Sequence, residues 1–128
     1  MLAFWAVDDS DEALRRELRG DFLRSLDRRV VEMASLLEAL AEDPESRDGL
    51  EKLHGLFHDL AGTGSMFGFP KVTAIGREGE LGANDLIRAN VAPNVSHLKR
   101  WRTLVDWLRK ELPPAKELYT PREDPGEE

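Results

Sequence analysis

Apolar side chains recur at every third or fourth position through most of the chain, which is the spacing of one face of an α-helix. The longest such stripe lies within residues 10–41 and consists of Leu14, Leu18, Phe22, Leu26, Val30, Met33, Leu37 and Leu40. No alternation long enough to suggest a β-strand occurs. The pattern therefore predicts an all-α protein, and its four long amphipathic segments predict an antiparallel four-helix bundle with short connections.

Polar, glycine and proline residues indicate where these helices begin and end. The expected starts are a cap at Ser10 for the first helix, Ser46 or Arg47 for the second, and a cap at Asn94 or Ser96 for the last. Gly20, followed by Asp21, leaves two possibilities open: one continuous first helix, or a short extra N-terminal helix before a longer one.

The third helix is expected over residues 71–83, although it contains three glycines. Its inward residues should be Val72, Ile75 and Leu81. The last helix should run to residue 112, and its predicted buried stripe is Val95, Leu98, Trp101, Val105, Leu108 and Leu112.

A length of 128 residues suits one hydrophobic core. We expect an N-terminal segment at residues 1–9, the bundle at residues 10–112, and a polar, proline-rich tail or linker at residues 113–128. The longest apolar run, residues 1–7, is too short to cross a membrane and has no basic flank of the kind found in signal peptides. No membrane association is expected, and a cytoplasmic location follows as an expectation.

The composition excludes several kinds of site. The chain has no cysteine, so disulfides, thiolate catalysis and cysteine-bound zinc are ruled out. Its formal net charge of −7 argues against nucleic acid as a partner, because phosphate backbones attract basic surfaces.

His58 has unusually small neighbours at helical spacing. Three and four positions away lie His54, Gly55, Ala61 and Gly62. A glycine inside a helix costs about 1 kcal/mol relative to alanine, so repeated glycines need a reason. A bare helix surface around one imidazole suggests a histidine that another protein must reach.

The segment HDLAGTGSMFG at residues 58–68 resembles the motif of the histidine phosphotransfer (HPt) domains of bacterial-type two-component phosphorelays. The family motif has leucine two residues and glycine four residues after the histidine, then small residues and a Leu-Gly pair. A helix rich in leucine and glutamate follows it, as the segment with Arg77, Glu78, Glu80 and Leu81 does here. The helix lengths agree with the family over roughly residues 14–112.

The resemblance implies a four-helix phosphoprotein of signal transduction that accepts a phosphoryl group on His58 and passes it on. The donor would be the aspartyl phosphate of a receiver domain or a sensor kinase, and the acceptor a second receiver. The receiver would supply Mg²⁺, and the domain itself would need no cofactor, have no ATP-dependent kinase activity and act as a monomer. The residues expected around the phosphoryl group or the docked partner are Gly62, Ala61, Gly55, His54, Ser65 and Asp59.

One position departs from the family motif. HPt domains usually have lysine three residues after the histidine, where its charge helps to hold the phosphoryl group, and this chain has Ala61. This favours an alternative in which the domain is a degenerate HPt fold kept for docking or dimerisation. A third hypothesis, a metal or cofactor carrier using His54 and His58, is disfavoured because the Glu-x-x-His spacing occurs only once, at residues 51–54, whereas four-helix metal carriers use a pair of such motifs. Met66 and Phe67 are candidates either for partner contact or for core packing.

Overall fold

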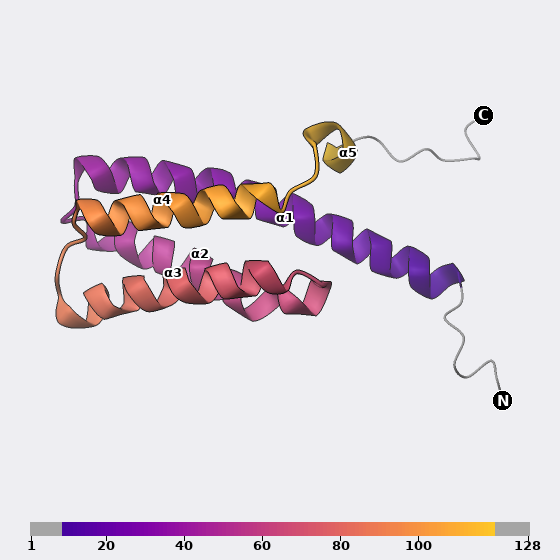
Figure 1. Cartoon of the computed structure of the whole chain (residues 1–128), viewed down its shortest axis with the longest axis horizontal. Helices are drawn as coiled ribbons and strands as arrows, with labels where there is room; N and C mark the ends of the chain where they lie inside the picture. The colour runs from indigo at the N-terminus through magenta and orange to yellow at the C-terminus, as the bar shows by residue number, and fades with distance from the viewer. Residues whose placement is uncertain (1–8, 120–128) are drawn as a thin grey trace.

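The computed structural model describes residues 9–119, which form an all-α bundle (Figure 1). No β-strand occurs within that range. The predicted fold class is therefore confirmed. The helices are α1 (Asp9–Glu42), α2 (Arg47–Thr63), the 3₁₀ turn η2 (Ser65–Phe67), α3 (Pro70–Ala89), α4 (Val95–Lys110) and the short α5 (Ala115–Tyr119).

Helix α1 is continuous, so the break considered at Gly20 does not occur. Its N-terminal part runs past the ends of the other long helices (Figure 1). Leu14 and Leu18 are therefore exposed, although they continue the same stripe as the buried Phe22 and Leu26. The stripe predicted the helix correctly, but it did not reveal where the neighbouring helices end.

One hydrophobic core lies between the four long helices. Its largest fully buried side chains are Phe57, Leu26, Met33, Leu37, Leu40, Leu53, Leu60, Leu104 and Leu108. Besides Leu14 and Leu18, two further residues predicted to face inward do not. Leu81 on α3 is 62% exposed, and Val95, at the first position of α4, is 80% exposed. Helix α3 also continues to Ala89, beyond the expected end at residue 83.

Two of the predicted helix starts are confirmed, and each has a side-chain cap. The Ser46 hydroxyl accepts a hydrogen bond from the Gly49 backbone N–H at 3.1 Å, at the start of α2. At the start of α4, the Asn94 side chain accepts from the His97 N–H, while His97 Nδ1 accepts from the Asn94 N–H, both at 3.0 Å. Ser10 lies inside α1, which begins one residue earlier, so it is not the residue that precedes the helix.

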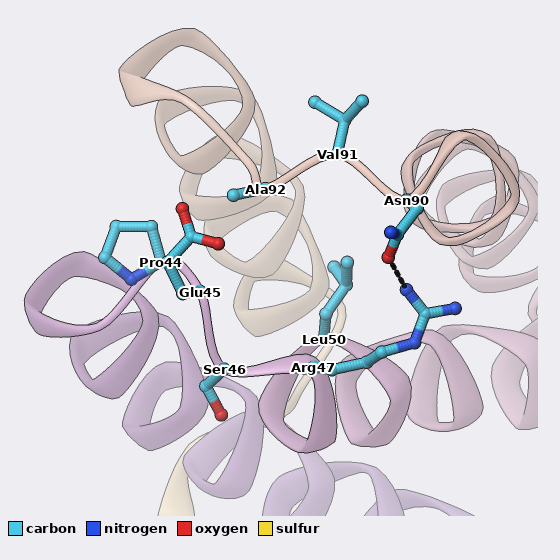
Figure 2. Close-up of a pocket in the computed structure, with 8 residues that line it drawn as sticks. All are labelled: Pro44, Glu45, Ser46, Arg47, Leu50, Asn90, Val91 and Ala92. Carbon is cyan, nitrogen blue, oxygen red and sulfur yellow. Dashed lines mark hydrogen bonds between the residues drawn. The ribbon is translucent and has the colours of Figure 1, made fainter.

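The α1–α2 and α3–α4 connections meet at one end of the bundle, where they enclose a small hollow (Figure 2). The Arg47 guanidinium spans it, donating to the Asn90 side-chain oxygen at 2.7 Å and to the Ile87 carbonyl at 3.2 Å. Asn90 ends α3 in the left-handed conformation, with φ of 57°. The hydrogen bonds of Arg47 therefore hold the two connections together, and the hollow has a structural origin.

Residues 115–119, which were expected to belong to the tail, form α5 and pack against α1. Leu118 is buried there, and its carbonyl accepts a hydrogen bond from Arg24 at 3.4 Å. The Tyr119 hydroxyl donates to the Asp27 carboxylate, which raises the pKa of Tyr119. Residues 1–8 and 120–128, which are most of the expected N-terminal segment and the end of the expected tail, lie outside the described range.

Two glycines of α3 allow its backbone to lie directly against α2. A Cβ atom built on Gly76 would lie 2.6 Å from the Ala61 backbone nitrogen, and one on Gly79 would lie 2.3 Å from the Phe57 ring. Any side chain at these positions would push the helices apart. The glycines that weakened the prediction of this helix therefore set the distance between α2 and α3.

Candidate functional site

His58 projects from α2 into solvent, on a face that the core does not use. Its side chain is 66% exposed, whereas the neighbouring Phe57 and Leu60 are fully buried. The stripe of Leu50, Leu53, Phe57 and Leu60 fixes which side of α2 faces the core, so the backbone periodicity alone turns His58 outward. The exposed ring fits the expectation from the sequence that another protein must reach this histidine.

A carboxylate from α3 contacts the inner nitrogen of the His58 ring. The two Glu80 oxygens lie 2.9 and 3.1 Å from Nδ1. Glu80 is only 24% exposed, so its side chain is held between the helices and not extended into solvent. The contact joins residues 22 positions apart, on two different helices. It therefore depends on the close approach of α2 and α3.

The Glu80 carboxylate raises the pKa of His58 above its ordinary value of 6.5, first through the hydrogen bond and then through its charge. Asp59 adds a smaller effect in the same direction. A raised pKa enlarges the protonated fraction at neutral pH, so the neutral ring is recovered as the pH rises. In that neutral ring, Glu80 favours the tautomer with hydrogen on Nδ1, which leaves the Nε2 lone pair free.

Glu80→Gln is expected to lower the pKa of His58 towards 6.5, because the amide keeps the shape of the carboxylate but loses its charge. An NMR titration of the His58 ring measures the midpoint directly. Glu78→Gln is the matched control, since Glu78 is on the same helix but pairs with Arg100 on α4. A midpoint that stays unchanged in Glu80→Gln would show that Glu80 does not perturb the ring.

The His58 side chain borders a shallow depression between α2 and α3. Its walls are His58, Ala61 and Gly62 from α2, and Arg77, Glu80 and Leu81 from α3. Of the residues predicted around the site, the structure thus brings Ala61 and Gly62 to the same hollow as His58. Gly55, His54, Ser65 and Asp59 do not line it.

Each of the other predicted residues has a different position. The His54 ring stacks on the His58 ring, with 6.2 Å between the centroids. Asp59 lies 3.9 Å from the Arg29 guanidinium of α1. The Ser65 backbone N–H donates to the Thr73 hydroxyl at 2.7 Å, which joins the end of α2 to the start of α3. Gly55 faces open space.

The two apolar candidates near the end of α2 differ in exposure. Met66 is 75% exposed, so it is available for contact with a partner. Phe67 packs inward and stacks on Phe22 of α1, with 5.1 Å between the ring centroids. Within residues 9–119, no group of three or more His, Asp or Glu side chains is arranged to hold a metal ion.

Gly62→Ala is expected to stabilise the fold by about 0.5–1 kcal/mol, because alanine favours the helix and the added Cβ meets no atom within 4 Å. Thermal or urea unfolding measures this change. The same substitution narrows the depression beside His58, so any partner that docks there should bind more weakly. A loss of stability would show that Gly62 is needed by the fold and not kept for access.

The sequence prediction gave no role to two residues of this depression, Glu80 and Arg77. Both lie on one face of α3, three residues apart. The sequence did contain an indication of their role. Charged residues three positions apart and next to glycines suggest a polar helix face that lies close to another helix. The sequence alone did not show which helix packs against that face, so it did not place Arg77 and Glu80 beside His58.

Comparison with known families identifies the chain. The model of the Hpt domain matches residues 17–111, which is most of the chain, and the chain belongs to this family. Hpt domains are histidine phosphotransfer carriers of phosphorelays and are not kinases. No curated protein and no solved structure matches the chain. None of the helices between residues 9 and 119 is long and apolar enough to cross a membrane.

Proposed function

We propose that this domain carries a phosphoryl group on Nε2 of His58, between the aspartate of one receiver domain and that of another. The observation that carries the proposal is the Glu80 carboxylate at 2.9 Å from Nδ1. The carboxylate occupies Nδ1 and so leaves Nε2 as the nucleophile, and the His58 side chain lines a hollow that is open to solvent.

The transfer step needs no proton donor. The Nε2 lone pair attacks the phosphorus of the aspartyl phosphate, an N–P bond forms, and the P–O bond to the aspartate breaks. The electron pair of that bond returns to the aspartate as a carboxylate. The ring then carries a positive charge, which Glu80 stabilises through its hydrogen bond to Nδ1–H, as a carboxylate does for other catalytic imidazoles.

The receiver should supply the remaining chemistry. Phosphoryl transfer depends mainly on positioning and on neutralising the charge of the phosphoryl oxygens. We expect Mg²⁺ and a lysine of the receiver to do this on the aspartate side, so the domain itself needs no cofactor. Docking should centre on the depression, with Gly62 leaving room and the exposed Met66 offering an apolar contact at its edge.

The test is to mix the domain with phosphorylated receivers and follow the phosphoryl group. The label should move to the domain, should be lost in acid and kept in alkali, as N–P bonds are, and should map to the peptide with His58. Phosphorylated receivers and phosphorylated kinases that all fail to label the domain would contradict the proposal.

The same experiment separates the second candidate, a degenerate HPt domain that only docks. Ala61, in place of the family lysine, is the observation that favours it. A degenerate domain should bind a receiver, as measured by calorimetry, yet take no label from it. Binding together with transfer excludes it.

A further inference from the structure

Because Ala61 replaces the family lysine, α2 provides no positive charge next to a phosphoryl group on His58. A phosphoryl group on His58 would bring two negative charges next to Glu80, and Ala61 offers nothing to balance them. The nearest lysine downstream along the chain, Lys71, is turned away, because it lines a different hollow between α3 and α4 with Trp107 and Lys110. No lysine lines the depression at His58.

Arg77 is the cation of that depression. It lies one turn before Glu80 on α3, so the two side chains share the face that meets α2. The α3 backbone next to it is in contact with α2, because a Cβ on Gly76 would touch the backbone of Ala61. The base of the Arg77 side chain is therefore held beside the position that the family gives to lysine.

The surroundings of Arg77 leave its guanidinium available. Within the described residues it forms no ion pair or hydrogen bond, and its side chain is exposed. The two carboxylates nearest to it on α3 are already engaged, Glu78 by Arg100 of α4 and Glu80 by His58. Ala61 has a short side chain, so it does not fill the space between Arg77 and the ring.

We propose that Arg77 binds the phosphoryl oxygens of phospho-His58, and so replaces from α3 the charge that the family lysine provides from α2. This inference rests on the proposed function and names a further residue of the same site. A guanidinium suits the task, because its planar N–H groups can contact two phosphoryl oxygens at once. The open side of the depression, lined by Gly62, would hold the phosphoryl group between ring and guanidinium.

The first test makes phospho-His58 without a receiver, using phosphoramidate as the donor and ³¹P NMR as the readout. Removing a cation should make the phosphoryl group harder to ionise, so Arg77→Ala should raise the pKa of that group. Arg88→Ala is the matched control, since Arg88 is also exposed on α3 but does not line the depression. An equal pKa in the wild type and Arg77→Ala would overturn the proposal.

The second test measures the equilibrium with a phosphorylated receiver. Loss of a charged hydrogen bond should shift the phosphoryl group towards the receiver by about tenfold in Arg77→Ala. The double variant Arg77→Ala/Ala61→Lys should recover most of that shift, because it restores the family arrangement. Absence of any shift in Arg77→Ala, or a double variant that recovers nothing, would contradict a role for Arg77 in charge balance.

The two tests distinguish a failure of the proposed function from a failure of the role assigned to Arg77. A receiver that never labels the wild type contradicts the proposed function, while the product made with phosphoramidate still tests Arg77. A His58 that takes no phosphoryl group even from phosphoramidate would overturn the assignment of Arg77 together with the proposed function.

Discussion

Replacing His58 by glutamine is expected to remove phosphoryl transfer completely, because no other group in the depression can form the N–P bond. The free energy of unfolding should change by no more than about 0.5 kcal/mol, since the His58 side chain is mostly exposed. A transfer assay with a labelled receiver, run beside thermal unfolding, measures both. The expected outcome is a fully folded domain that takes no label.

His54→Gln provides the control for that result. Both histidines are on α2, one turn apart with their rings stacked, but His54 does not line the depression. The His54→Gln variant should transfer the phosphoryl group at a rate within a few-fold of the wild type. Label that remains in His58→Gln and disappears in His54→Gln would move the acceptor to the neighbouring ring and refute the site described above.

Gly76→Ala is expected to destabilise the domain by about 3 kcal/mol, the upper part of the range for an overpacked core. The new Cβ would lie 2.6 Å from the Ala61 nitrogen and 2.8 Å from the Phe57 carbonyl oxygen. Both are backbone atoms, so no side chain can rotate to make room and the helices must separate. A fall in the melting temperature of roughly 10 °C should follow.

A second effect of Gly76→Ala distinguishes helix separation from a local clash. If α2 and α3 move apart, the contact between Glu80 and His58 lengthens and the pKa of His58 falls. Gly62→Ala, on the open side of α2, should show neither effect. A Gly76→Ala domain as stable as the wild type would mean that the two helices are not held together by backbone contact.

The sequence was sufficient to predict the helices, because their signals are local. Apolar spacing gave the four long helices, and the side chains of Ser46 and Asn94 identified two of the starts. The errors have a shared cause. Leu14, Leu18, Leu81 and Val95 fit a helical stripe but are exposed, since burial depends on where the neighbouring helix lies and ends.

The candidate site was only partly predictable for the same reason. His58, Ala61 and Gly62 were identified together because they are neighbours along one helix. Glu80 and Arg77 come from another helix, and their distance from His58 is set by the contact of α3 with α2. The resemblance to HPt domains implied that the usual lysine is missing at residue 61, but the sequence did not reveal that α3 places Arg77 at the same depression.

The Glu80 contact also has a thermodynamic consequence for a carrier. The carboxylate that orients the imidazole for attack stays beside it after the phosphoryl group arrives, so like charges then lie on both sides of one ring. This repulsion between Glu80 and the phosphoryl oxygens would offset part of the stabilisation that Glu80 gives to the positively charged ring, and so would limit how tightly the phosphoryl group is held. A phosphoryl group held in this way would remain available for onward transfer, as the proposed carrier role requires.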